Sequence, residues 1–314
     1  MTNGGISRRE LLRLAGVGGG ALGLAALLGA CDRGEPSGPS APAGSLQALQ
    51  ANATQLSLLG AQSQLQAGQG PFTFGLATPD NRLVVGGNPE VWVARDDTSK
   101  AEGPFPTRWY ELAAYKQTKD RSPHSELTGF YAAPLELTQA GNWMVAATLN
   151  LDGARAVGRG AVPVVAAADA PAAVGSKAKL VRTPVARTAA ERAKVCTRDP
   201  ACPLHEVSLD DALRAGRPTV VNFATPLLCS SRMCGPVVDE QMVAAAKLGG
   251  KASFVHVELF PDRDPDKPAR ALTAYGFTTE PWLLVVDRDR VIRARFEGPV
   301  TAAQIEAALR PLLA

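Results

Sequence analysis

The last hundred residues alternate between short β-branched apolar runs and segments with an apolar residue every three or four positions. The first pattern predicts buried strands and the second predicts helices. The expected elements are helices over 209–215, 237–248, 268–275 and 301–309, and strands over 218–224, 252–259, 282–287 and 291–297. Because a helix separates the first two strands, these should be parallel, and a short turn makes the last two a hairpin. The pattern predicts an α/β fold of order βαβαββα after a leading helix.

Residues 71–167 follow a different pattern, in which short apolar or alternating runs recur between turn signals. The runs occupy 72–77, 83–86, 90–95, 129–133, 142–149 and 161–166. Several short strands at this spacing predict an all-β domain, an immunoglobulin-like sandwich. The sequences at 129–134 and 139–143 resemble small periplasmic sandwiches of the FixH/YtkA kind.

Residues 1–31 have the order of an export signal. The pair Arg8-Arg9 precedes an apolar run that ends in Leu-Gly-Ala-Cys31. This order resembles a twin-arginine signal peptide with a bacterial lipobox, which implies cleavage before Cys31 and a lipid on that cysteine. The run over 14–30 holds six glycines, and its length of roughly 17 residues is short for a transmembrane helix. We therefore expect an exported protein, anchored by lipid to the outer face of the cytoplasmic membrane.

Two segments lack a periodic pattern and are expected to connect the folded parts. Residues 32–70 are rich in Gly, Pro, Ser, Ala and Gln, which predicts a flexible tether. Residues 168–204 are expected to be a linker that carries Cys196 and Cys202. The folded parts are then a β-sandwich domain at 71–167 and an α/β domain at 205–314.

The balance of charged residues argues against a nucleic-acid partner. The chain has 33 Lys and Arg against 30 Asp and Glu. Without the three arginines and one glutamate of the first thirty residues, 30 basic and 29 acidic residues remain. A chain so balanced has no basic surface for nucleic acid, whereas a hydrophobic fraction of 46% is enough for a core.

Residues 205–313 resemble the thioredoxin superfamily in element order and in local sequence. The segment 218–224 matches the first core strand of that family, 229–240 its active-site loop and helix, and 279–285 the segment with its cis-proline. The resemblance implies a thioredoxin-like fold in which Cys229 and Cys234 are catalytic and a cis-Pro281 lies beside them.

Four cysteines remain once Cys31 is assigned to the lipid. An even number in an exported chain predicts pairs that can be oxidised, with three connectivities allowed. Proximity in sequence favours Cys196 with Cys202, in a loop stiffened by two prolines, and we interpret that pair as a structural disulfide.

The four-residue spacer between Cys229 and Cys234 differs from the two-residue spacer of thioredoxin and resembles that of peroxiredoxin Q. In one continuous helix, residues five apart lie about 140° apart around the axis. Their Cα atoms would be too far apart for a disulfide, which needs about 4.4–6.8 Å. Cys229 must therefore precede the helix, or the first turn must unwind.

Opposing charges and dipoles surround the expected nucleophile, Cys229. The amides of the following helix and the cation of Arg232 should lower its pKa, whereas the carboxylate of Glu280 should raise it. Asn222 stands where thioredoxin has its buried carboxylate, so the usual proton acceptor is replaced.

Three functions remain open on these residues. The preferred one is thiol–disulfide exchange with exported protein thiols or disulfides, in an undetermined direction and without a cofactor. The second is copper binding of the Sco type by Cys229 and Cys234 with His205 or His256, because soft thiolates suit Cu(I). His256 lies in an apolar strand, so we interpret it first as a core residue. The third is a redox-silent scaffold in which both cysteine pairs are structural.

Overall fold

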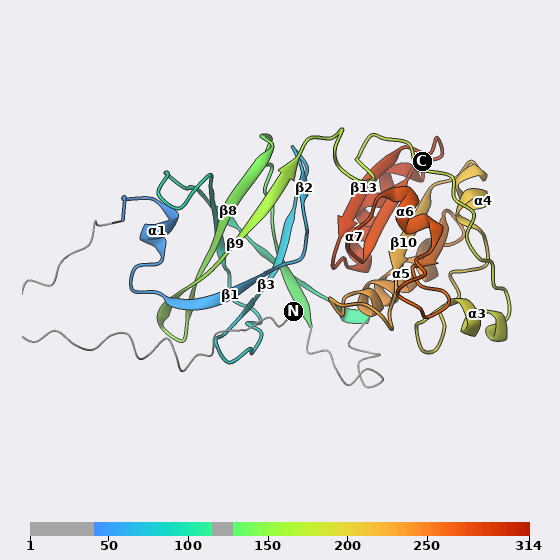
Figure 1. The fold of residues 1–314 in the computed structure, drawn as a ribbon, viewed down its shortest axis with the longest axis horizontal. Helices are drawn as coiled ribbons and strands as arrows, with labels where there is room; N and C mark the ends of the chain where they lie inside the picture. Colours follow the sequence, from blue (N-terminus) through green and yellow to red (C-terminus); the bar gives the residue numbers. More distant parts are fainter. Residues whose placement is uncertain (1–40, 115–127) are drawn as a thin grey trace, which may run out of the picture. The chain divides into compact units, whose positions relative to one another are not determined.

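The structure is a computed structural model that describes residues 41–114 and 128–314 (Figure 1). The expected signal residues Arg8 and Arg9 and the expected lipidation site Cys31 lie outside the described residues. In the two described ranges, no helix combines the length and the hydrophobicity that a transmembrane span requires.

The first half of the described chain forms one nine-stranded sheet after the short helix α1 (Leu46–Leu49). Its strands are β1 (Thr54–Gly60), β2 (Leu65–Gln66), β3 (Phe72–Ala77), β4 (Glu90–Ala94), β5 (Glu102–Pro106), β6 (Arg108–Glu111), β7 (Gly129–Ala133), β8 (Gly141–Leu151) and β9 (Ala154–Val165). The order is β5-β4-β8-β9-β1-β3-β7-β6, and β2 pairs with β9. The longest pair is the hairpin of β8 and β9, whose turn places Asp152 and Gly153 at positive φ.

Strand β1 joins the two halves of this sheet. Thr54–Ser57 pairs in parallel with β9, and Ser57–Gly60 pairs antiparallel with β3. The expectation of a flexible tether over 32–70 is therefore wrong for the residues of α1, β1 and β2. Only Leu56 among the side chains of β1 is buried, so its hydrophobic pattern is too weak to predict a strand. The segment forms a strand because its backbone pairs with β9 and with β3.

A large hydrophobic cluster collects side chains from several strands of this sheet. Phe74 and Tyr131 enter it from β3 and β7, and Val93 and Val145 enter it from β4 and β8. The Tyr131 hydroxyl donates a hydrogen bond to the carbonyl of Val84 at 3.0 Å, in the segment 83–86 that we expected to be a strand and that forms only an isolated bridge. The structure is thus sheet-rich in this half, and the immunoglobulin-like sandwich stays a prediction.

The second half has the predicted element order. Its elements are α3 (Ala189–Val195), α4 (Leu209–Arg214), β10 (Thr219–Ala224), α5 (Cys234–Leu248), β11 (Ser253–Glu258), α6 (Arg270–Tyr275), β12 (Trp282–Val286), β13 (Ile292–Glu297), α7 (Ala302–Leu309) and the 3-10 helix η2 (Arg310–Leu312). The sheet order is β11-β10-β12-β13, in which β10 and β11 are parallel and the other pairs antiparallel. The βαβαββα order with this sheet gives the second half a thioredoxin-like fold.

Alternate residues of β10 lie in two different hydrophobic clusters. Val221 and Phe223 lie in the hydrophobic cluster that contains α4 and α6 residues. Val220 and Ala224 lie in the cluster that contains α5 and α7 residues. Every residue of β10 is buried, as expected for a central strand with both faces covered.

The segment expected to be a linker packs along the second half. The amide of Ala178 donates to the carbonyl of Arg290, and the amide of Ala186 donates to the carbonyl of His205. Cys196 and Cys202 are buried in the same cluster as α5. Backbone hydrogen bonds, which leave no periodic pattern in the sequence, hold this segment in place. The described residues from Ala41 onward form one compact unit, so the division into domains at 71–167 and 205–314 stays a prediction.

Substitution within β1 tests its place in the sheet. Leu56→Ala should lower the free energy of unfolding by about 2–4 kcal/mol, because it leaves a cavity in the core. Leu59→Ala is the matched control, since Leu59 lies in the same strand and is 46% exposed; its effect should stay below about 1 kcal/mol. Denaturant titration of both variants measures the difference, and equal small effects would show that this segment is a tether.

Candidate functional site

Cys229 and Cys234 lie on either side of the start of a helix. Cys229 follows β10 in a turn, and α5 begins at Cys234. The turn includes Arg232 at a φ of 60°. The backbone amide of Cys234 donates to the Cys229 sulfur at 3.3 Å. Cys229 thus precedes the helix, which is the first of the two arrangements that allow the two thiols to approach.

The two thiols have opposite environments. Cys229 is partly exposed, whereas Cys234 is fully buried. Hydrogen bonds with Cys234 and, to a smaller extent, with the Ser231 hydroxyl together lower the pKa of Cys229 to about 7, against the opposing effect of burial. Burial raises the pKa of Cys234 well above its ordinary value. The arrangement favours a thiolate at Cys229 and a protonated thiol at Cys234.

Glu280 and Pro281 lie against the cysteine turn. The amide and the hydroxyl of Ser230 both donate to the Glu280 carboxylate at 3.3 Å. The Ser231 hydroxyl oxygen lies 3.2 Å from the Glu280 carbonyl oxygen, and the peptide bond before Pro281 is cis. The carboxylate raises the pKa of Cys229, as expected. Arg232, which we expected to lower that pKa, is not among its largest causes.

Asn222 occupies the expected buried position on β10. Neither its side-chain oxygen nor its nitrogen has a hydrogen-bond partner among the described residues. Asn222 is paired in register with His256 of β11. No carboxylate therefore stands at this position to accept a proton from Cys234.

A second cysteine cluster lies beside this one. Cys196 ends α3, Cys202 and His205 follow in the loop before α4, and His256 lies on β11. All four side chains are at most 3% exposed, and one ligand atom from each lies within 4.8 Å of the others. The two sulfurs are 3.8 Å apart and both cysteines are free thiols. The disulfide between Cys196 and Cys202 thus stays a prediction.

The structure places both histidines beside a different pair of cysteines from the pair that we expected to bind copper. Both lie with Cys196 and Cys202, whereas the group around Cys229 and Cys234 contains Glu280 and, in the described part of the chain, no histidine. Sequence reasoning missed this cluster because His256 has apolar neighbours on its strand. The two-residue spacing between Cys202 and His205 was the one local signal, since such spacings are typical of metal ligands.

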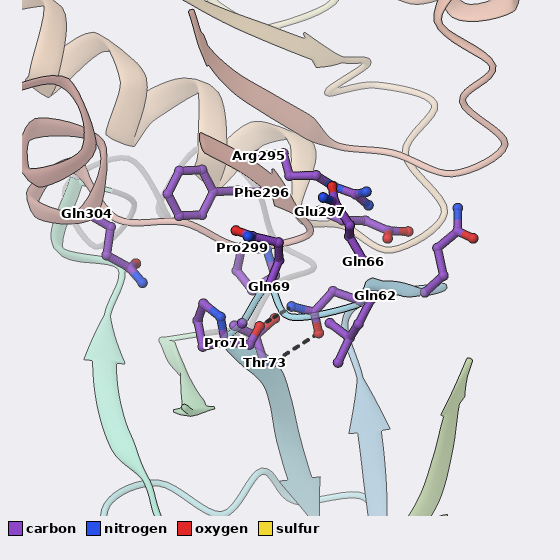
Figure 2. A pocket seen from close by; sticks show the side chains of 13 residues that line it. Gln62, Gln66, Gln69, Pro71, Thr73, Arg295, Phe296, Glu297, Pro299 and Gln304 are labelled. Atoms are coloured by element: carbon purple, nitrogen blue, oxygen red, sulfur yellow. Dashed lines mark hydrogen bonds between the residues drawn. The ribbon is translucent and has the colours of Figure 1, made fainter. Parts of the chain in front are cut away.

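A polar pocket elsewhere in the structure contains no thiol (Figure 2). Its lining includes Gln62, whose side chain accepts a hydrogen bond from the Thr73 amide at 2.9 Å and donates one to the Pro71 carbonyl at 3.0 Å. Glu297 accepts hydrogen bonds from the Ser63 amide and the Thr279 hydroxyl at the same carboxylate oxygen. Gln62 and Glu297 are thus hydrogen-bonded within the protein, and the lining, which has no cysteine, offers no candidate for cysteine chemistry.

No protein-family model and no curated protein matches this chain. Among solved structures, it is similar to a secreted thiol-disulfide isomerase from Corynebacterium glutamicum, at 17% identity and a TM-score of 0.27, over 34% of this chain and 75% of the other. It is also similar to a thiol:disulfide interchange protein of the thioredoxin family from Chlorobium tepidum, at 17% identity and a TM-score of 0.28, over 44% of this chain and 100% of the other. At these values, the fold assignment depends on the strand order and helix placement of the chain itself.

The pH dependence of alkylation tests the environment of Cys229. In the reduced protein, its alkylation rate should rise with a midpoint near pH 7, while Cys234 stays unlabelled at neutral pH. Ser231→Ala removes a hydrogen bond to the thiolate and should raise the midpoint by roughly 0.5–1 pH unit. Glu280→Gln removes the opposing charge and should lower it.

Peptide mapping by mass spectrometry assigns the label. Ser230→Ala is the control for Ser231→Ala, because the Ser230 hydroxyl reaches Glu280, and it should shift the midpoint less. A midpoint above pH 8.5 for the unmodified protein would contradict the described hydrogen bonds.

Proposed function

We propose that this protein catalyses thiol–disulfide exchange with exported proteins, with Cys229 as the attacking thiol and Cys234 as the resolving thiol. The observation that supports it is the partly exposed residue Cys229, whose sulfur accepts a hydrogen bond from the Cys234 amide and contacts the Ser231 hydroxyl, each at 3.3 Å. A thiolate is the reactive form of cysteine. A pKa near 7 leaves a large thiolate fraction at neutral pH without the loss of nucleophilicity that a much lower pKa brings.

The reaction proceeds in two exchanges. The Cys229 thiolate attacks one sulfur of a substrate disulfide, a mixed disulfide forms, and the other substrate sulfur leaves as a thiolate that takes up a proton. Cys234 then loses its proton and attacks the Cys229 sulfur, which releases the second substrate thiol. The substrate gains two electrons and two protons, and a Cys229–Cys234 disulfide remains. The reverse sequence oxidises a substrate dithiol.

The surroundings of Cys229 suit a polypeptide substrate. Leu227, two residues before Cys229, is 57% exposed and offers an apolar contact. Pro281 begins the segment that lies against the cysteine turn, and its position matches the cis-proline of the thioredoxin resemblance. We assign Pro281 to substrate positioning.

The proposed setting is the cell envelope. The Arg8-Arg9 pair and the sequence ending in Cys31 support twin-arginine export and a lipid anchor. A sandwich domain of the FixH/YtkA kind at 71–167 would then carry the thioredoxin-like domain at 205–314 outside the cytoplasmic membrane.

Trapping of a mixed disulfide tests the proposed roles. Cys234→Ser should accumulate a covalent complex with a disulfide-containing model protein, because the intermediate lacks its resolving thiol. Cys229→Ser should form none, and the double variant is the control for trapping by other cysteines. Non-reducing electrophoresis and mass spectrometry measure the complex. If Cys234→Ser traps nothing and the unmodified pair exchanges no disulfide, the scaffold interpretation replaces this one.

The mass of the membrane-extracted protein tests the proposed anchor. The chain should begin at Cys31 and carry a diacylglyceryl group on its sulfur. Cys31→Ser should abolish the lipid and release the protein from membranes. A soluble, unmodified chain that retains Met1 would contradict both export and lipidation.

A further inference from the structure

We propose that Cys196, Cys202, His205 and His256 bind a zinc ion in a closed tetrahedral site. The proposal is independent of the exchange reaction, since neither Cys229 nor Cys234 belongs to the set. Two thiolates and two imidazoles form one of the common ligand sets of structural zinc, and closed four-ligand sites are typical of it. The four side chains come from three segments of the chain, namely the end of α3, the loop before α4 and β11, so the fold brings them together.

The distances among three of the four ligand atoms fit a tetrahedral zinc, and an atom of His205 lies within 4.8 Å of each of the three. With Zn–S bonds of about 2.3 Å and Zn–N bonds of about 2.0–2.1 Å, two sulfurs should lie about 3.8 Å apart, and a sulfur and a nitrogen about 3.6 Å apart. The two sulfurs are 3.8 Å apart. Nδ1 of His256 lies 3.3 Å from the Cys202 sulfur and 3.8 Å from the Cys196 sulfur. An ion at the centre requires only small movements of these atoms.

The outer contacts of His256 orient it as a ligand. Its Nε2 lies 3.2 Å from the carbonyl of Ala224, which can only accept, so Nε2 carries the proton. Nδ1 then presents its lone pair to the two sulfurs. A hydrogen bond from the second ring nitrogen to a carbonyl is typical of metal-ligating histidines, because it fixes the tautomer and the ring orientation.

His205 gives a second, independent indication. Its Nε2 is buried and makes no hydrogen bond among the described residues, and its ring lies 4.7 Å from that of His256, centroid to centroid. A buried polar nitrogen without a partner is costly. Coordination of a metal through this nitrogen would satisfy it, whereas a disulfide between Cys196 and Cys202 would not.

Contacts around Cys196 hold the loop in place. The amide and the hydroxyl of Thr197 donate to Glu258 of β11 at 2.8 and 2.7 Å. Arg198 forms an ion pair with Asp239 of α5 at 2.7 Å, and both side chains are nearly buried. The loop that carries Cys196 is thus attached to strand β11 and to helix α5.

Binding has a simple balance. One Zn²⁺ replaces one proton on each of the two thiols, both protons go to solvent, and the two histidines bind as neutral rings. No electron is transferred. The ion would connect the segment of α3, the loop before α4 and β11, so its role would be to stabilise the fold.

Metal analysis of the full chain tests the site. Protein purified under reducing conditions without chelators should contain one zinc per chain, and Cys196→Ser should lose it. The variant with both Cys229→Ser and Cys234→Ser is the matched control and should retain it. Zinc that is lost in this control and kept in Cys196→Ser would overturn the proposal.

Spectroscopy of the unmodified protein avoids dependence on a variant that could unfold. Co²⁺ added to the metal-free chain should give thiolate-to-cobalt charge transfer and the intense visible bands of a tetrahedral site, and Zn²⁺ should abolish both. Added Zn²⁺ should also raise the Tm and protect Cys196 and Cys202 from alkylation. Absence of metal binding would overturn the proposal. A disulfide between Cys196 and Cys202 in the freshly isolated protein, detected by peptide mapping as a mass two hydrogens below that of the reduced chain, would overturn it as well. Retention of Cu(I) in place of Zn²⁺ when both are supplied would overturn the identity of the ion.

Discussion

The buried strand β10 determines the position of both cysteine groups. It is hydrogen-bonded to β11 on one side and to β12 on the other, and all its side chains are buried. Its last residue, Ala224, accepts a hydrogen bond from the Leu259 amide and lies against Nε2 of His256. Five residues later the chain reaches Cys229. Neighbouring strands fix β10 on both edges, and packed side chains fix it on both faces. This rigid strand therefore positions the turn that carries Cys229 and the carbonyl that orients the His256 ring.

The two groups are also joined by side chains. The Thr197 hydroxyl donates to Glu258 and accepts the Leu227 amide at 3.2 Å, so the loop after Cys196 contacts the turn before Cys229. Arg198 and Asp239 add a nearly buried ion pair between the same loop and α5, the helix that begins at Cys234. Loss of one partner of such a pair leaves a buried charge, at a cost of about 3–5 kcal/mol. The contacts around the buried cluster thus also hold the turn of the partly exposed Cys229 in place.

The sequence predicts the second half well because its signals are local. Runs of buried side chains at β10, β11 and β12 have the length and composition of strands, and the spacer before α5 places Cys229 ahead of the helix. The sequence fails where the determining contacts are distant. Strand β1 buries only Leu56, so its place depends on two backbone partners far along the chain. The neighbours of His256 in sequence are apolar, and nothing local shows that Cys196, 60 residues earlier, lies beside its ring.

The two cysteine groups differ in solvent exposure, and this difference suits them to different chemistry. A partly exposed sulfur such as that of Cys229 can be reached by a second polypeptide, and its amide and hydroxyl donors stabilise the thiolate that exchange requires. Cys196 and Cys202 are buried, and the Nδ1 lone pair of His256 faces both sulfurs. In the oxidising compartment that the proposed export implies, two thiols 3.8 Å apart are expected to form a disulfide unless a ligand holds them as thiolates. A bound metal would do so because it holds both sulfurs as thiolates at a separation too long for a bond, and this leaves Cys229 and Cys234 as the pair that is free to change its oxidation state.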